Sequence, residues 1–136
     1  MRVVRFEIDL PPKVLSPNLA KGVHWGRKGP AAREYRALAM VRCREAANGK
    51  LFGRARISFL FGLRDRRPAA VRREDARYHP SDFDNAVGSL KALIDGIVDA
   101  GVIPDDSWRH LECGEVRCDF ERGPWVEVRL EEIQDG

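Results

Sequence analysis

The first residues of the chain alternate between apolar and polar side chains, which is the pattern of a half-buried strand. Within Arg2–Leu10, the side chains of Val4, Phe6 and Ile8 fall on one face and charged side chains fall on the other. Two prolines, Pro11–Pro12, follow directly. Because proline has no amide hydrogen to donate to a sheet, we expect the strand to end there.

A loop, a helix and a second strand are predicted next. Turn-forming residues dominate the stretch 13–30 and indicate a loop. Residues 31–48 combine good helix formers with spaced apolar side chains, and Asn48–Gly49 would end that helix. Residues 54–63 alternate again and predict a strand, with an apolar face of Ile57, Phe59 and Phe61. An arginine-rich loop follows this strand.

The strongest helical pattern covers residues 83–100 and is closed by Gly101, a residue type that is common just after helices. On one continuous helix, four residues would share a face within about 40° of each other, namely Asp84, Gly88, Lys91 and Asp95. The neighbouring apolar sector would face the core, with Val87, Leu90, Ile94, Ile97 and Val98.

Two short strands complete the predicted fold. They cover residues 111–120 and 125–133, and the turn Arg122–Gly123–Pro124 joins them. The resulting order, β-α-β-α-β-β, has no internal repeat. It predicts a single α+β domain over residues 1–136, in which two main helices pack on a mixed β-sheet.

Composition agrees with one globular domain of 136 residues, of which 43% are hydrophobic and 33% charged. No segment approaches the roughly 18 apolar residues of a membrane span, and the N-terminus lacks the apolar run of a signal peptide. We therefore expect a cytoplasmic protein with no membrane partner. The three cysteines lack C-x-x-C spacing, so neither a disulfide scaffold nor a zinc site is predicted.

The formal net charge of +3 is unevenly divided along the chain. Residues 1–80 hold 19 lysines and arginines against 7 acidic residues, whereas residues 81–136 hold 5 against 14. This asymmetry indicates a polyanionic partner for the basic half. The acidic half would have a different task, because carboxylates repel a polyanion unless cations lie between them. The alternative is a solvated surface with an accidental bias.

Carboxylates gather around the last predicted helix. Asp82 and Asp84 lie at its start, Asp95 lies within it, and Asp105–Asp106 follow the turn after it. A few carboxylates, together with water and phosphate oxygens, are what holds Mg²⁺ in proteins. Such an ion can activate water against a phosphodiester, and Lys91 could stabilise the developing charge. The pattern therefore favours a nuclease.

Each of these residues also has a purely structural explanation. Asp82 or Asp84 could cap the helix. Lys91 and Asp95 could form an ion pair one helical turn apart, and Asp105–Asp106 could be ordinary turn residues. A cap needs only one carboxylate, however, so the full set favours a shared role.

Three motifs in this region stand in a fixed order. They are D-x-D-N at Asp82–Asn85, K-x-x-x-D at Lys91–Asp95 and G-x-x-x-D-D at Gly101–Asp106. Together with the first strand ending in Pro-Pro, this combination resembles the RusA family of Holliday-junction resolvases, which are small Mg²⁺-dependent endonucleases of bacteria and their phages. The resemblance covers most of the chain. One spacing differs, because the family's lysine stands three residues after the Asn, whereas Lys91 stands six residues after Asn85.

The resemblance implies the roles of the site residues. The catalytic aspartates that bind Mg²⁺, or Mn²⁺ in its place, would be Asp82, Asp84 and Asp106, with Asp105 and Asp95 as additional candidate ligands. Lys91 would be the catalytic lysine. The resemblance further implies a homodimer that cuts two strands of a four-way junction symmetrically, leaves 5′-phosphates and acts in DNA recombination and repair.

Basic residues near the predicted loops are the candidates for DNA contacts. They are Lys21, Arg27, Lys28, Arg64, Arg66, Arg67, Arg72, Arg73 and Arg77. Their alternative is a solvated loop without a ligand. Trp108 is expected in the core or at a dimer interface.

Two other functions are compatible with the same residues. A non-catalytic nucleic-acid-binding protein of this fold would bind DNA in a salt-dependent manner without cutting it. A metal-dependent phosphohydrolase acting on small substrates would need a small, closed pocket around Asp84.

Overall fold

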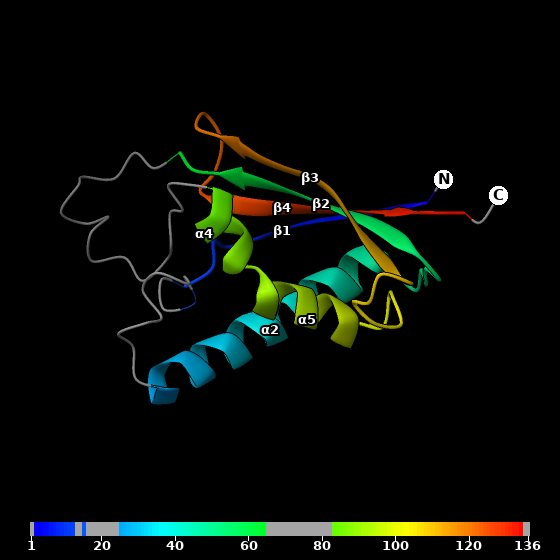
Figure 1. Cartoon of the computed structure of the whole chain (residues 1–136), viewed down its shortest axis with the longest axis horizontal. Coiled ribbons are helices and arrows are strands. Elements are labelled where there is room, and N and C mark those ends of the chain that lie inside the picture. The colour runs from blue at the N-terminus through cyan, green and yellow to red at the C-terminus, as the bar shows by residue number, and fades with distance from the viewer. Residues whose placement is uncertain (1, 13–14, 16–24, 65–82, 135–136) are drawn as a thin grey trace.

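A four-stranded mixed sheet, covered on one face by helices, forms the protein in the computed structural model (Figure 1). The structure describes residues 2–12, 15, 25–64 and 83–134. In chain order the elements are β1 (Val3–Ile8), α2 (Trp25–Ala47), β2 (Ala55–Gly62), α4 (Phe83–Gly88), α5 (Lys91–Asp99), β3 (Leu111–Asp119) and β4 (Trp125–Glu132). The predicted α+β class is confirmed, with the second predicted helix divided into two.

The strands lie in the order β1-β4-β2-β3. β4 pairs antiparallel with β1 and with β2, while β2 and β3 run parallel. A parallel pair needs a long crossover, and here the connection contains α4 and α5. Val128 of β4 pairs with Phe6 of β1 and with Phe59 of β2, and all three are buried. The centre of the sheet is therefore an apolar layer under the helices.

The predicted alternation in the strands is confirmed by burial. The buried apolar side chains of β1, β2 and β4 are Val4, Phe6, Ile8, Ala55, Ile57, Phe59, Phe61, Val126, Val128 and Leu130. Burial of apolar surface stabilises a fold by roughly 25 cal/mol per Å². This face of the sheet therefore forms one side of the hydrophobic core.

Helix α2 begins earlier than the sequence predicts. The expected loop extends to residue 30, whereas the helix begins at Trp25 and contains Pro30. Pro30 is the sixth residue of this helix, so its nitrogen cannot donate to the carbonyl group four residues earlier, and the helix forms in spite of that missing hydrogen bond. The buried face of α2 repeats every fourth residue, with Tyr35, Ala39, Cys43 and Ala47.

The predicted helix 83–100 is interrupted at Ser89. This side chain is buried, and its hydroxyl donates to the carbonyl oxygen of Ala86 at 2.7 Å. The amide groups of Ser89 and Leu90 bond to the carbonyl groups of Ala86 and Val87 at 3.3 and 3.1 Å. These hydrogen bonds join residues that are three apart, as in a 3₁₀ turn and not an α-helix. Helix α4 therefore ends before α5 begins.

The break separates residues that one continuous helix would have kept on one face. Asp84 and Gly88 belong to α4, whereas Lys91 and Asp95 belong to α5. The predicted stripe of four residues is therefore wrong. Val87, which was expected in the core, is exposed for the same reason.

Candidate active site and nucleic-acid interface

Helix α4 lies at the end of the sheet where β2 and β3 finish, and the N-terminal end of α2 lies at the same end of the molecule (Figure 1). Asp84 is in the first turn of α4, but its side chain is outside the described part. Asp82 also lies outside the described residues. The role of both aspartates as metal ligands stays a prediction.

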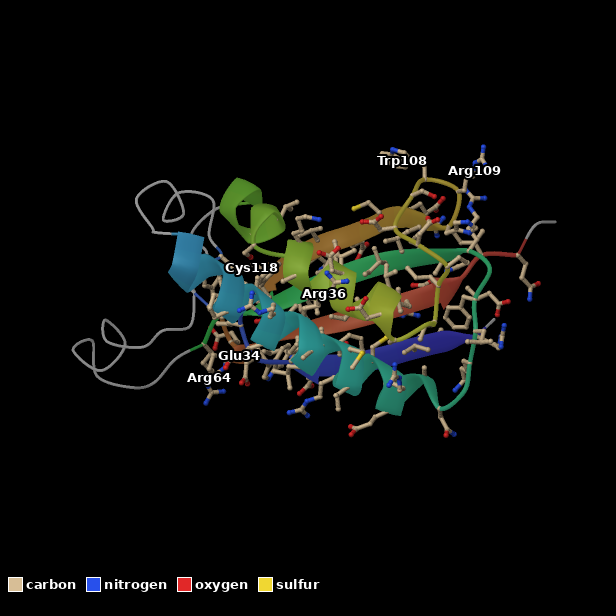
Figure 2. The ribbon with its side chains drawn as sticks, turned by 90° about the horizontal axis from the view of Figure 1, so that it is seen from below. Glu34, Arg36, Arg64, Trp108, Arg109 and Cys118 are labelled. Atoms are coloured by element: carbon tan, nitrogen blue, oxygen red, sulfur yellow. The ribbon has the colours of Figure 1, made fainter. Side chains whose placement is uncertain are left out.

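Arg64 is the member of the predicted DNA-contact set whose side chain is described (Figure 2). It follows β2, and its Nη1 donates to the carbonyl oxygen of Glu121 at 3.2 Å. Its amide group donates to the carbonyl oxygen of Arg122 at 2.9 Å. A guanidinium has five N–H donors, so these contacts fix Arg64 beside the β3–β4 turn and leave it able to bind a phosphate.

The other candidates for DNA contacts cannot be placed in the same way. Those that lie outside the described residues are Lys21, Arg66, Arg67, Arg72, Arg73 and Arg77. Arg27 and Lys28 belong to the first turns of α2, and their side chains are also outside the described part. Their contact with DNA stays a prediction.

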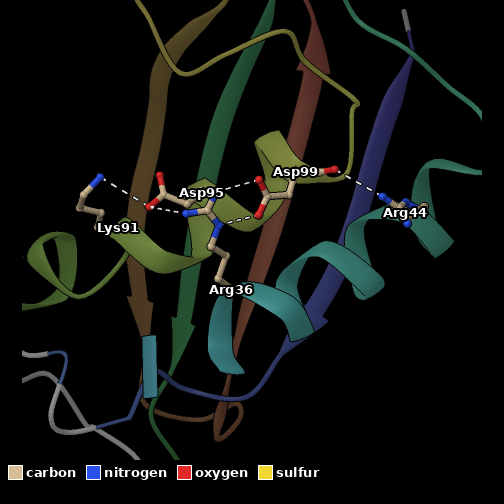
Figure 3. A network of polar contacts seen from close by, with 5 residues as sticks. All are labelled: Arg36, Arg44, Lys91, Asp95 and Asp99. Atoms are coloured by element: carbon tan, nitrogen blue, oxygen red, sulfur yellow. Dashed lines mark hydrogen bonds and ion pairs between the residues drawn. The ribbon is translucent and has the colours of Figure 1, made fainter. Parts of the chain in front are cut away.

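Asp95 lies between two cations at the surface of the helical layer (Figure 3). Its Oδ2 is 3.5 Å from Nζ of Lys91 and 3.9 Å from Nη1 of Arg36. The structure thus contains the ion pair between Lys91 and Asp95 that their spacing allows. Because both cations already neutralise this carboxylate, an additional metal ion at Asp95 would have to compete with them.

Arg36 also binds Asp99, one turn further along α5. Its Nε and Nη2 donate to the two carboxylate oxygens at 2.5 and 2.8 Å (Figure 3). These hydrogen bonds hold the pKa of the Asp99 carboxyl below its ordinary value. Arg36 is a residue that the sequence reasoning did not single out, because nothing in the local pattern links α2 to a partner 63 residues away.

Lys91 remains open to solvent in spite of this ion pair. Its side chain is 83% exposed, whereas that of Asp95 is 26% exposed. The ammonium group can therefore turn toward an external phosphate while α5 stays in place. This is compatible with the electrostatic role that the sequence predicts for it.

The Asp105–Asp106 turn is ordered by contacts of its own. One carboxylate oxygen of Asp105 accepts from the amide of Ser107 at 2.8 Å, and the other lies 3.9 Å from Nε2 of His110. The hydrogen bond from Ser107 lowers the pKa of the Asp105 carboxyl. Asp106 is exposed. These contacts agree with the alternative that Asp105 is a turn residue, and its role as an additional metal ligand stays a prediction.

Helix α5 stands between Asp84 and the Asp105–Asp106 turn. Figures 1 and 2 show the turn region, marked by Trp108 and Arg109 in Figure 2, at the opposite end of α5 from α4. A helix of this length, nine residues, spans roughly 13 Å. Oxygen ligands lie only about 2.1 Å from a shared Mg²⁺. The turn that carries Asp106 and the helix that carries Asp84 therefore lie apart within one chain.

Ion pairs join the basic half of the chain to its acidic half. These are Arg2–Glu132, Arg5–Glu127, Arg36–Asp99 and Arg56–Glu112. The charges of these residues, which the sequence separates into two halves, therefore neutralise each other across the fold. These four arginines lie outside the predicted DNA-contact set, so the four ion pairs involve no residue of that set.

Trp108 is not a core residue. Its side chain is 84% exposed on the turn before β3 (Figure 2). Trp125, at the start of β4, is half-buried, and the guanidinium of Arg122 lies over its ring at 5.1 Å from the ring centre. A place for Trp108 at a dimer interface stays a prediction.

Neither the described part of the structure nor comparisons with known proteins add a functional assignment. In the part of the chain that the structure describes, no three His, Cys, Asp or Glu residues are grouped as they would be around a metal ion. Among those same residues, no helix is both long and apolar enough to cross a membrane. No family model and no characterised protein matches the chain.

Proposed function

We propose that the chain is a Mg²⁺-dependent, structure-selective DNA endonuclease that resolves four-way junctions by paired, symmetric hydrolysis of phosphodiester bonds. The observation that carries the proposal is the motif Asp82–Asn85 at the start of α4, followed by an exposed Lys91 at the start of α5. The products would carry 5′-phosphates. Such an activity belongs to DNA recombination and repair, and a bacterial or phage cytoplasm is the setting we propose.

The positions of Arg64 and of the start of α2 support DNA as the substrate. The end of β2, which Arg64 follows, lies at the same end of the molecule as the start of α2, which contains Arg27 and Lys28 (Figure 1). Lysine and arginine bind the phosphate backbone and set the register of a nucleic acid. A DNA strand held by these residues would pass beside α4.

The donor chemistry of Asp82 and Asp84 suits Mg²⁺, because both offer hard carboxylate oxygens. Mn²⁺ has the same oxygen preference and is expected to substitute. When bound, such an ion supplies an activated water and a Lewis acid for phosphodiester hydrolysis. Lys91 would place a positive charge near the phosphate. We assign the metal role to Asp82 and Asp84 first, since Asp106 lies beyond the far end of α5.

A homodimer fits this activity. Symmetric cutting of two strands needs two equivalent sites, and a twofold dimer supplies them. Branched DNA and a second copy of the chain are therefore the partners that we propose.

The test uses purified protein with labelled four-way junction, flap, duplex and single-stranded DNA. We expect paired nicks in the junction that require Mg²⁺ and that a chelator removes. Asp84→Asn and Asp82→Asn should abolish cleavage while junction binding is kept or becomes tighter, because a repulsive charge is lost. Glu34→Gln, an exposed carboxylate of α2, is the matched control and should cut normally. No metal-dependent cutting of any DNA would contradict the proposal.

One observation favours a second candidate, a non-catalytic nucleic-acid-binding protein of the same fold. This observation is that the turn between α5 and β3 lies at the opposite end of α5 from α4 (Figures 1 and 2). The second candidate predicts salt-sensitive junction binding without cleavage. Under it, Lys91→Ala would leave cleavage absent and would weaken binding by no more than the loss of one phosphate contact.

A further inference from the structure

Strand β3 forms an edge of the sheet. It pairs with β2 on one side, and no described strand pairs with its other side. An edge strand presents a row of backbone donors and acceptors that another chain can pair with. β3 is nine residues long, which is enough for such a pairing.

The hydrogen bonds of β3 show which of its backbone groups point outward. The carbonyl oxygen of Asp119 accepts from the amide of Leu63 at 3.0 Å, and the amide of Glu115 donates to Oγ of Ser58 at 3.1 Å. Residues 115 and 119 therefore turn their backbone groups toward β2. Because these groups alternate along a strand, those of Val116 and Cys118 point to the open edge.

The helix-facing side of β3 is incompletely covered. Val116 is only half-buried, Cys118 is exposed, and Phe120, just after the strand, is 73% exposed. On β1, the opposite edge strand, the helix-facing side chains are all buried. Exposed apolar groups gathered at one edge mark an interaction surface. The apolar side of the sheet is thus fully covered at the β1 edge and partly exposed to solvent at the β3 edge.

The other face of β3 carries two side chains of opposite charge. Glu115 and Arg117 flank Val116, line a hollow of about 340 Å³ on the open face of the sheet, and have side chains that are 74% and 70% exposed. Their mutual contact is a loose one of 3.6 Å. In an antiparallel pair centred on Val116, Glu115 stands directly opposite Arg117 of the second copy, and the reverse pair forms as well.

We propose that two copies of this chain assemble through β3, with the strands antiparallel and the twofold axis at Val116. Three independent features agree with this register. The backbone groups of Val116 point outward, its apolar neighbours are uncovered, and the flanking charges are complementary. The interface is the same patch on both copies, as a twofold axis requires. The proposal rests on the homodimer of the proposed function and names its interface, and junction cleavage reports nuclease activity separately.

Charge reversal tests the interface by analytical ultracentrifugation of the full chain. The wild type is expected to be a dimer. Arg117→Glu and Glu115→Arg, each alone, place like charges opposite each other and should raise the dissociation constant about tenfold or more. The double variant Glu115→Arg/Arg117→Glu restores both pairs and should dimerise like the wild type. Arg42→Glu, an exposed residue of α2, is the matched control and should have no effect.

The outcomes are decisive in either direction. A monomeric wild type at high concentration overturns the proposal, and so does a dimer that Arg117→Glu leaves unchanged. A double variant that stays monomeric although its circular dichroism matches the wild type overturns the Glu–Arg register. Junction cleavage measured on the same samples reports the nuclease proposal independently.

Disulfide trapping tests the register without relying on charge. In a Cys113→Ser/Cys118→Ser background, Glu115→Cys and Arg117→Cys are prepared as separate proteins. Directly opposed residues of an antiparallel pair lie within disulfide range, whereas positions 115 and 115 lie diagonally, about 7–8 Å apart. Oxidation should therefore crosslink the mixture and neither protein alone. Crosslinking of one protein alone, or none in the mixture, overturns the register.

Discussion

Arg36 and Asp99 join α2 to α5 through two parallel hydrogen bonds (Figure 3), and the two helices approach each other closely at Gly96. Gly96, one helical turn before Ala100, makes this approach possible. A Cβ atom there would lie 2.4 Å from the carbonyl oxygen of Arg36 and 2.6 Å from Cβ of Ala39. The helical layer therefore depends on a missing side chain as well as on an ion pair.

Gly96→Ala should destabilise the protein by about 1–3 kcal/mol, because the two helix backbones must move apart to admit a methyl group. Urea unfolding followed by circular dichroism measures this. Gly53→Ala is the matched control, since a Cβ at that position meets nothing within 4 Å. A Gly96→Ala protein as stable as the control would show that the helices are not packed as described.

Acidification should remove the contribution of Asp99 to stability. Hydrogen bonds from Arg36 lower the pKa of this carboxyl in the folded state. Its contribution is therefore complete above the unfolded pKa of about 4 and is lost as the pH falls through the folded value. The unfolding midpoint of Asp99→Asn should lie below that of the wild type at neutral pH, and the difference should shrink toward zero near about pH 2.

The control for this pH dependence is Glu45→Gln, which removes an exposed carboxylate from the outer side of α2. Its unfolding midpoint should follow that of the wild type at each pH. A constant difference between Asp99→Asn and the wild type from neutral to acid pH would contradict the role of the Arg36–Asp99 pair.

The strands were predictable because their signal is local. Alternation in β1 and β2 places Val4, Phe6, Phe59 and Phe61 on one face, and each is buried as expected. The break between α4 and α5 was not predictable in this way. The apolar spacing continues through Ser89, and only the buried hydroxyl, bonded to Ala86, shows that the helix ends.

The candidate site was predictable in its residue types and much less in its arrangement. The spacing of Lys91 and Asp95 correctly places them together, since an ion pair one turn apart is a local feature. The partner of Asp99, by contrast, comes from α2, and no local pattern identifies it. The separation of Asp106 from Asp84 follows from the path of α5, which is a property of the tertiary fold.

The three free cysteines should differ in reactivity. Cys43 is fully buried, and burial raises the pKa of its thiol to about 11. Cys113 and Cys118 are exposed, although partial burial and Asp119 raise the pKa of the Cys118 thiol. Because the thiolate is the reactive form, a thiol reagent should label Cys113 first, Cys118 more slowly, and Cys43 only after unfolding in guanidinium.

Mass spectrometry of the labelled protein identifies each labelled cysteine. The protein is kept dilute, so that dimerisation through β3 does not cover Cys113 and Cys118. Cys113→Ser should remove the fastest phase and leave the slower ones unchanged. Rapid labelling of Cys43 in the folded protein would contradict its burial on the inner face of α2.

Lys91→Ala separates function from stability. Its side chain is 83% exposed, so the melting temperature should stay within about 2 °C of that of the wild type. If Lys91 stabilises charge on the phosphate, the junction cleavage rate should fall about a hundredfold or more. Asp95→Asn is the control, because it removes the ion-pair partner of Lys91 and keeps the ammonium group. It should retain most of the cleavage. Equal losses in both variants would instead assign Lys91 a structural role through its ion pair.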